Sequence, residues 1–285
     1  MLEEVTQDTP IEPHLYRGLL YYVKREDLCM VDKNAPPFAK PRGLYPRMVD
    51  LKTKGIETVG YMETAVSMAA WAISYFAHLL DMKAVIYMPN YKDGLRLEQE
   101  RQVAKWQLWG AKIELLDNPN RLQINYYRAR KHLKENYKNA VMLEHGIPLQ
   151  ETIIEVSNQV ALVPPELLGG TIVSCIGSGV MVAGVLRGLH KHFPRTSNDI
   201  KGILVAPKNV VLKRNEIIKR AGIQIGGLTD HNSLQIIDAG YQYTDKEECS
   251  CPFPCNPYYD RKAFKWMMLN LKKLKPPVLF WSIGA

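Results

Sequence analysis

Gly177, Ser178 and Gly179 form the segment whose residue types and spacing most directly predict chemistry. They follow an apolar, β-type run at residues 171–175 and precede a helical pattern that starts at Met181. Backbone N–H groups of such a turn, aimed from the start of a helix, can hold an anion such as a phosphate group. A tight strand-to-helix connection needs the same glycines, so the turn alone is not specific. It fits the dinucleotide-binding fingerprint only in part, and the sequence has no G-x4-G-K-[ST] loop, which disfavours an NTPase.

A second segment places Lys40 directly before Pro41, Arg42 and Gly43, between a predicted strand and a predicted helix. A lysine held at such a turn and partly desolvated can form a Schiff base, because burial lowers the pKa of its ammonium group. The competing interpretation is a solvated lysine on a basic surface, since most lysines are exposed.

Three cysteines cluster near the C-terminal end of the sequence, at positions 249, 251 and 255, beside two prolines. One interpretation is a metal site completed by Cys29 or His231, and the other is a proline-stiffened loop with reduced thiols. Structural zinc sites are typically built from C-x2-C pairs, which this spacing lacks, so we expect no metal.

The composition sets broad limits on the class of protein. Charged residues make up 23% and hydrophobic residues 46% of the 285 positions, which excludes a mainly disordered chain. An odd number of cysteines, five, argues against a disulfide framework. Apolar runs are too short to span a bilayer, and the acidic start Met1-Leu2-Glu3-Glu4 is unlike a secretory signal, so we expect a cytoplasmic protein without membrane contact.

The elements that must position these residues follow from hydrophobic periodicity. Strands are predicted at residues 19–23, 56–62, 84–88, 113–116, 141–143, 171–175, 202–205 and 278–281, and helices at 45–54, 65–80, 95–109, 122–137, 152–160, 181–190 and 262–273. Because strands alternate with helices, the sequence predicts an α/β protein with two lobes, each a mostly parallel sheet flanked by helices.

The net charge of +8 suggests an anionic partner without identifying one. One basic group interleaves with tyrosines, and a second follows later in the chain: Arg121, Arg128, Arg130, Lys131, Lys134 and Lys138 with Tyr126, Tyr127 and Tyr137, and then Lys208, Lys213, Arg214, Lys219 and Arg220. Contact with a nucleic-acid backbone is one interpretation. A solvated basic helix face is the other, and no nucleic-acid-binding motif accompanies these residues.

Several segments, taken in order, resemble the tryptophan-synthase-β-like pyridoxal-phosphate enzymes of fold type II, which include threonine synthase, cysteine synthase, aminocyclopropane-carboxylate deaminase and D-cysteine desulfhydrase. The segments cover most of the chain: Tyr22-Val-Lys-Arg-Glu-Asp-Leu28, the lysine motif Lys40-Pro-Arg-Gly43, Met82-Lys-Ala-Val-Ile-Tyr-Met-Pro89, Trp109-Gly-Ala-Lys-Ile-Glu-Leu115, Leu149-Gln-Glu-Thr-Ile-Ile-Glu155, Cys175-Ile-Gly-Ser-Gly-Val-Met-Val-Ala-Gly184, Asn256-Pro-Tyr-Tyr-Asp-Arg-Lys-Ala263 and Val278-Leu-Phe-Trp-Ser-Ile-Gly-Ala285. The resemblance implies a large cofactor-binding lobe at residues 1–50 and 147–285 and a smaller inserted lobe at 51–146.

The resemblance also implies roles for individual residues. Lys40 would form the Schiff base with pyridoxal 5'-phosphate and act as acid and base at the substrate α-carbon. Gly177, Ser178 and Gly179 would bind the cofactor phosphate. Either Asp260 or Ser282 would contact the pyridine nitrogen, and a carboxylate there strengthens the ring as an electron sink. Tyr259 would be a catalytic tyrosine. An ordinary, exposed acid at a helix start remains the alternative for Asp260.

Three departures from the family pattern stand out. Val180 replaces the fourth glycine of the phosphate loop, Pro41 follows Lys40 where relatives usually carry Asp or Thr, and the third departure concerns the substrate. The loop that holds the substrate carboxylate in the family corresponds to Gly60–Met68, which lacks the family's glycine and asparagine, so Thr64 and Ser67 are the expected substrate-binding residues. We therefore expect a pyridoxal-phosphate lyase or transferase, a homodimer by resemblance, acting on an amino-acid-like amine by elimination, replacement or deamination. One alternative is the same chemistry on an amino-acid-like group attached to nucleic acid. The other is a catalytically silent member that serves as a binding or structural protein.

Overall fold

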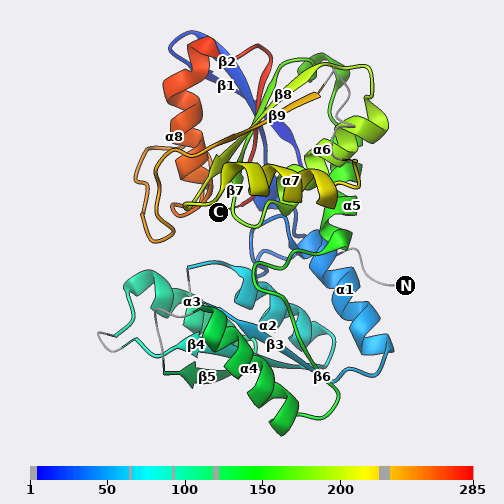
Figure 1. The fold of residues 1–285 in the computed structure, drawn as a ribbon, viewed down its shortest axis with the longest axis vertical. Coiled ribbons are helices and arrows are strands. Elements are labelled where there is room, and N and C mark those ends of the chain that lie inside the picture. The colour runs from blue at the N-terminus through cyan, green and yellow to red at the C-terminus, as the bar shows by residue number, and fades with distance from the viewer. Residues whose placement is uncertain (1–4, 64–65, 92–93, 118–121, 225–231, 285) are drawn as a thin grey trace. The chain divides into compact units, whose positions relative to one another are not determined.

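The computed structural model describes residues 5–63, 66–91, 94–117, 122–224 and 232–284 (Figure 1). The chain divides into two compact units. The larger unit comprises Met1–Lys33, Pro37–Gly43 and Leu149–Ala285, and the smaller unit comprises Asn34–Pro36 and Leu44–Pro148. Within the described residues, no helix is both long and apolar enough to cross a membrane.

The larger unit is built on a six-stranded sheet with the order β1-β2-β10-β7-β8-β9. Its strands are β1 (Ile11–Tyr16), β2 (Leu19–Lys24), β7 (Thr171–Ile176), β8 (Asn198–Leu204), β9 (Asn232–Ile237) and β10 (Val278–Trp281). The hairpin β1–β2 is antiparallel, and every other pair is parallel. The carboxyl ends of the parallel strands therefore share one edge of the sheet, where ligands bind in open α/β folds.

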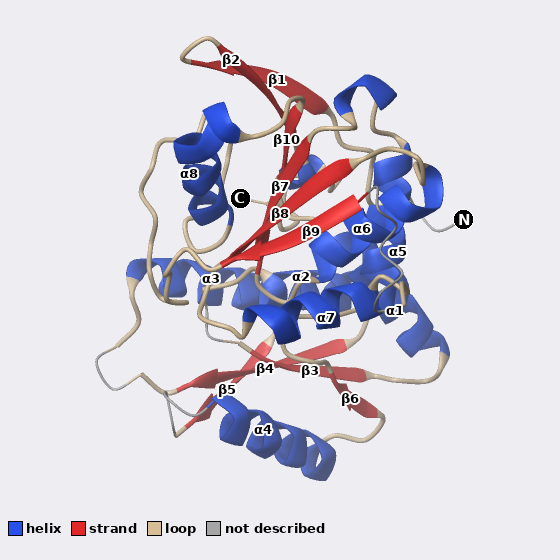
Figure 2. Cartoon of the chain, turned by 45° about the horizontal axis from the view of Figure 1, so that its top comes forward, coloured by secondary structure: helices blue, strands red, loops and turns tan. Residues whose placement is uncertain are grey.

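Helices cover both faces of this sheet (Figure 2). The helices α5 (Gln150–Ala161), α6 (Val180–His192) and α7 (Val210–Arg220) lie on one face, and α8 (Asp260–Asn270) lies on the other. Each face of the sheet packs on its own hydrophobic core, and successive strand residues point into opposite cores. Leu279 packs with α5, α6 and α7, and its neighbour Phe280 packs with α8. This alternation explains why the parallel strands read as continuous apolar runs.

The helices α5 and α6 pack closely because two glycines of α6 face α5. A Cβ atom at Gly184 would lie 2.5 Å from Cβ of Val156, and one at Gly188 would lie 2.5 Å from Cβ of Val160. Real Cβ atoms do not approach that closely, so any larger residue would push the two helices apart.

The smaller unit has a four-stranded parallel sheet with the order β5-β4-β3-β6. Its strands are β3 (Thr58–Met62), β4 (Lys83–Pro89), β5 (Lys112–Leu116) and β6 (Ala140–Met142), and its helices are α2 (Ala69–Leu79), α3 (Leu97–Leu108) and α4 (Leu122–Asn136). Helix α1 (Pro41–Thr53) begins in the larger unit and continues into the smaller one. Short 3-10 helices occur at Glu26–Leu28, Pro165–Leu167 and Leu271–Lys273.

The predicted fold class, α/β with two mostly parallel sheets flanked by helices, is confirmed. The structure adds β1, β9 and α7, which periodicity did not predict. Strand β1 contains Pro13, a residue that edge strands tolerate but that weakens the strand signal. Helix α1 starts at Pro41 rather than near Tyr45, because a proline at the first helical position lacks only an N–H group that would be unpaired anyway.

Candidate active site

Lys40 lies immediately before α1, in a turn that backbone contacts hold in place. Its carbonyl oxygen accepts a hydrogen bond from the N–H of Gly43 at 3.1 Å. The N–H of Ala39 donates to the carbonyl oxygen of Ile283 at 2.9 Å, so the turn is tied to the segment after β10. A Cβ at Gly43 would lie 2.1 Å from the backbone nitrogen of Thr152 at the start of α5, which explains the glycine. The lysine side chain is half-buried.

Asp260 is a fully buried carboxylate, with 0% of the residue exposed. Its Oδ2 atom accepts three hydrogen bonds, from Ser282 Oγ at 3.0 Å and from the N–H groups of Ile283 and Gly284 at 2.9 Å each. Burial raises the pKa of Asp260 to about 7, although these hydrogen bonds oppose the shift. The alternative of an exposed acid at a helix start is therefore excluded.

Cys175, a buried residue of β7, lies beside Asp260. Its Sγ atom donates to Oδ1 of Asp260 at 3.4 Å. Burial and the neighbouring Asp260 raise the pKa of the Cys175 thiol well above its usual value, and the charge of Lys40 partly opposes this. Backbone contacts link the two segments, because Ile283 donates its N–H to Asp260 and accepts through its carbonyl oxygen from Ala39, the neighbour of Lys40. The structure therefore groups the Lys40 turn, Asp260 and Ser282 in one part of the larger unit.

The glycine turn lies at the carboxyl end of β7, beside the carboxyl end of β10, from which Ser282 follows. Gly179 is the N-cap residue of α6 with a φ of +87°, a conformation that favours glycine. A Cβ at Gly179 would lie 2.8 Å from Cγ1 of Ile217, and one at Gly177 would lie 3.2 Å from the ring of Tyr259. Ile217 and Tyr259 therefore pack closely against this turn, which favours glycine at both positions.

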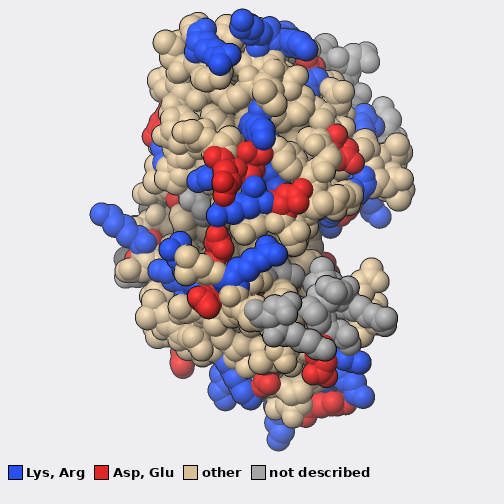
Figure 3. All heavy atoms as spheres, turned by 90° about the vertical axis from the view of Figure 1, so that its left-hand side faces the viewer, with Lys and Arg blue, Asp and Glu red and all other residues tan. Residues whose placement is uncertain are grey.

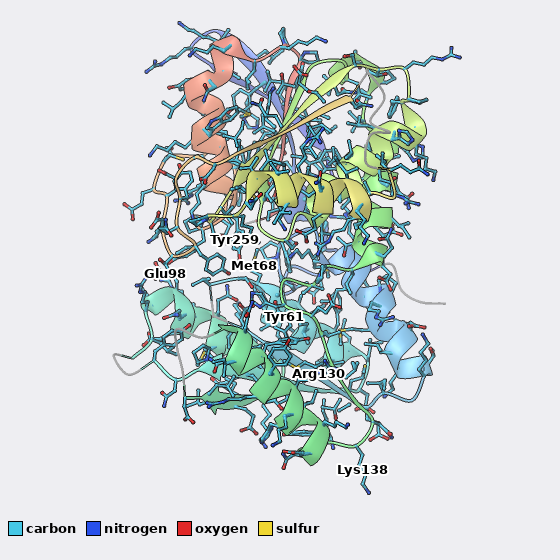
Figure 4. The ribbon with its side chains drawn as sticks, in the orientation of Figure 1. Tyr61, Met68, Glu98, Arg130, Lys138 and Tyr259 are labelled. Carbon is cyan, nitrogen blue, oxygen red and sulfur yellow. The ribbon has the colours of Figure 1, made fainter. Side chains whose placement is uncertain are left out.

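Tyr259 is the N-cap residue of α8 (Figure 4), and its ring lies against Gly177. Its hydroxyl group forms a hydrogen bond of 2.6 Å with the hydroxyl group of Tyr243. The sequence analysis missed Tyr243, which lies in an irregular segment where no periodicity or motif marks it. The structure thus adds a second tyrosine to the site.

Three cations surround the carbonyl oxygens of the same turn. Lys208 Nζ donates to the carbonyl oxygen of Gly177 at 3.2 Å, and Lys213 Nζ and Arg220 Nη1 donate to that of Ser178 at 3.0 and 2.8 Å. The sequence shows these three residues as part of a basic group. It does not show that they meet at the glycine turn, because that depends on the pairing of β8 with β7.

The expected substrate residues lie in the smaller unit. Ser67 precedes α2, and its hydroxyl group donates to Oε2 of Glu63, a residue with 0% exposure. The same Oε2 atom accepts from the N–H of Ala70, at 3.4 Å, in the first turn of α2. The chain's own carboxylate therefore occupies donors at this helix start. Thr64 lies outside the described residues.

The first basic group lies on α4 and just beyond it, where Arg130 and Lys138 are exposed (Figure 4). Arg128, Lys131 and Lys134 are exposed as well, and Arg121 lies outside the described residues. On the face drawn in Figure 3, lysine and arginine side chains are interspersed with aspartate and glutamate, so the described part of that face carries no continuous basic surface.

The five cysteines are free thiols, and the described residues contain no group of three or more His, Cys, Asp or Glu side chains suited to a metal ion. Cys249 donates through Sγ to the carbonyl oxygen of Arg261 at 3.6 Å. His231, considered above as a fourth ligand, lies outside the described residues.

Known proteins resemble this chain in both sequence and fold. No family model matches the sequence. The chain is 34% identical over 293 residues to the glycyl-dTMP PLP-dependent decarboxylase of Pseudomonas phage M6, with 98% of this chain and 99% of the relative aligned. Among solved structures, an ACC deaminase homologue superposes with a TM-score of 0.77 at 20% identity, covering 99% of this chain and 90% of the other.

Two hydrogen sulfide-producing enzymes from Fusobacterium nucleatum superpose with lower scores. Their TM-scores are 0.66 at 16% identity and 0.63 at 12% identity, covering 99% of this chain and 87% and 96% of theirs. At these identities, the solved structures show a shared fold, whereas the phage relative is similar enough in sequence to belong to the same family.

Proposed function

The chain belongs to the pyridoxal-phosphate-dependent enzymes of fold type II, and from this premise we propose that it decarboxylates an amino-acid group carried by a thymidine nucleotide. The observation that carries the proposal is the backbone link through Ile283 between the Lys40 turn and the buried Asp260, in a chain 34% identical to a glycyl-dTMP decarboxylase. Membership of an enzyme family with the lysine retained disfavours the silent, purely structural alternative.

The residues of the larger unit fit the cofactor. A phosphate group suits the glycine turn, because the turn stands at the N-terminus of α6 and its N-cap, Gly179, makes no side-chain cap hydrogen bond. A primary amine for the aldehyde is present in Lys40. A buried carboxylic acid whose pKa is raised to about 7, Asp260, suits a ring nitrogen that carries a positive charge.

Bound pyridoxal phosphate supplies an aldehyde carbon that bonds to a primary amine and a ring that accepts an electron pair. Lys40 would hold the cofactor through its side-chain amine. When carbon dioxide leaves the substrate, the ammonium group of Lys40 would give a proton to the α-carbon in its place and would itself be left as a neutral amine.

Asp260 and Ser282 have different tasks in this proposal. Oδ2 of Asp260 accepts hydrogen bonds from Ser282 and two N–H groups, whereas Oδ1 accepts from the weak Cys175 thiol donor. Asp260 therefore pairs with the pyridine nitrogen through Oδ1, and Ser282 positions the carboxylate. Tyr259 and Tyr243 share one hydrogen bond, so Tyr259 can donate to a substrate or cofactor oxygen while Tyr243 holds its ring in place.

The proposal extends to partners and location. Thr64 and Ser67 contact the substrate, the enzyme acts in the cytoplasm as a homodimer, and the nucleotide is either free or part of a nucleic acid. The altered loop at Glu63–Ser67 supports a substrate unlike a free amino acid, because a carboxylate bound there would meet the Glu63 charge.

The direct test is a product assay on the holoenzyme with glycyl-dTMP. Stoichiometric release of carbon dioxide, with retention of the amine, is the expected result. Lys40→Ala should lower kcat by at least about 1000-fold and remove the visible absorbance of the lysine-bound cofactor. Release of ammonia or hydrogen sulfide instead of carbon dioxide would replace decarboxylation by deamination or elimination.

A further inference from the structure

The glycine turn has two faces, and cations gather on only one of them. Lys208, Lys213 and Arg220, here called the carbonyl-side cluster, all donate to carbonyl oxygens of Gly177 or Ser178. In a trans peptide the C=O group and the following N–H group point in opposite directions. An anion held by the N–H groups of Ser178 and Gly179 therefore lies across the peptide from these cations, about 8 Å away.

The cluster holds more positive charge than its own carboxylate balances. Glu216 bonds to Lys213 and to Arg220, each at 2.7 Å, so one negative charge faces three positive ones. Much of the Lys208 side chain is exposed, but its ammonium group is partly desolvated, and this together with the charge of Lys213 lowers the pKa of Lys208. Repulsion between the neighbouring positive charges disfavours the protonated form of the lysines, and a bound anion would reduce this repulsion.

The cluster is also built into the fold rather than scattered over a surface. Lys213 is only 4% exposed and is fixed from two sides by Ser178 and Glu216. Lys208 follows the carboxyl end of β8, which pairs in parallel with β7 through Ile176 and Leu204. The cluster thus lies at the ligand-binding edge of the sheet, and Lys208 keeps it open to solvent.

We propose that Lys208, Lys213 and Arg220 form a second phosphate site that binds the phosphate group of the nucleotide substrate. The inference rests on the proposed function, since the nucleotide is what brings a second phosphate to an enzyme whose first phosphate belongs to the cofactor. Two lysines and an arginine around one point are the donors that proteins use for phosphate. The cofactor phosphate and the substrate phosphate lie on opposite faces of one turn.

The test is binding of thymidine 5'-monophosphate, which lacks the amino-acid group, to the holoenzyme by titration calorimetry. Lys208→Gln should weaken this binding about tenfold and leave binding of thymidine unchanged, because the lost contact is to the phosphate. Lys219→Gln is the matched control, since Lys219 is an exposed lysine of the same helix as Lys213; it should change both affinities less than about twofold. A dithymidine phosphodiester, measured alongside, shows whether a free nucleotide or a nucleic-acid strand is the better source of the phosphate.

Three results would overturn the proposal. Wild-type enzyme could bind the monophosphate and the diester no more tightly than thymidine. Lys208→Gln could leave phosphate-dependent binding intact, which would mean that the cations only stabilise the turn through its carbonyl oxygens. Lys208→Gln could instead weaken binding of the cofactor, which would assign the cations to the cofactor phosphate. Because this assay needs no turnover, its failure is distinct from failure of the decarboxylation assay.

Discussion

The helices α6 and α2 begin at turns that use their N–H groups in different ways. At α6 the N-cap residue is Gly179, with a φ of +87° and no side-chain cap. At α2 the buried Glu63 carboxylate accepts from Ser67 and from the N–H of Ala70. Both helix starts attract negative charge. The helix start of α6 thus has no side-chain cap, whereas that of α2 has a side-chain carboxylate as its acceptor.

In the proposed function, the first turn holds the cofactor and the second contacts the substrate. The resemblance to the pyridoxal-phosphate family is closer around Lys40 and the glycine turn than around Glu63 and Ser67. We therefore expect variants of the larger unit to alter cofactor chemistry and variants of the α2 turn to alter substrate affinity alone.

After Lys40, the largest expected effect is at Asp260. Asp260→Asn replaces the carboxylate that we propose as the partner of the pyridine nitrogen by a neutral group of the same shape, and we expect kcat to fall about 100- to 1000-fold. Steady-state kinetics on the holoenzyme check this, with cofactor content measured in the same samples. A variant that retains nearly full kcat would transfer the pyridine contact to Ser282.

The same carboxyl group makes the stability of the apoprotein depend on pH. Its pKa is raised from 3.8 to about 7, so between these values the native state holds a proton that the unfolded chain releases. The free energy of unfolding should therefore fall as pH rises from about 4 to about 7, by no more than about 4 kcal/mol from this group. Denaturant unfolding of wild type and Asp260→Asn at several pH values measures the contribution of Asp260. If the free energy of unfolding changes equally with pH in the two proteins, the raised pKa of Asp260 is contradicted.

A smaller effect is expected at the glycine turn. Gly179→Ala adds a Cβ 2.8 Å from Ile217 at a positive φ and should weaken cofactor binding about tenfold. Gly240→Ala is the matched control, because Gly240 has a φ of +80° but no atom within 4 Å of the added Cβ. Titration of the apoproteins with cofactor measures both affinities. If the two variants lose affinity equally, backbone strain rather than the turn is responsible.

The smallest effect belongs to the smaller unit. Ser67→Ala removes one donor to Glu63, which keeps the N–H of Ala70, so we expect KM to rise about threefold or less and cofactor affinity to stay unchanged. Ser74→Ala on the same helix, whose hydroxyl group donates to the carbonyl oxygen of Ala70, controls for the loss of a buried hydroxyl group. A large fall in kcat for Ser67→Ala, but not for Ser74→Ala, would contradict the expectation that the α2 turn affects substrate affinity alone.

Much of the fold and the core of the site could be predicted from short segments. Parallel strands are buried on both faces and leave apolar runs in the sequence, and Lys40 and Gly177 stand beside such runs. Tyr243 and the carbonyl-side cluster could not be found in this way. Tyr243 meets Tyr259 across an irregular segment, and Lys208 reaches Gly177 only because β8 pairs with β7 in one register. Contacts between distant residues leave no local pattern to read.

Helix α5 limits the side chains that two neighbouring segments can carry. At one point Thr152 excludes any atom beyond the α-carbon of Gly43, and at another Val156 does the same to Gly184. A larger residue at either glycine would therefore displace the segment that follows Lys40 or helix α6 from α5. In the proposed enzyme, such a displacement would change cofactor binding through packing alone, without altering a residue that contacts the cofactor.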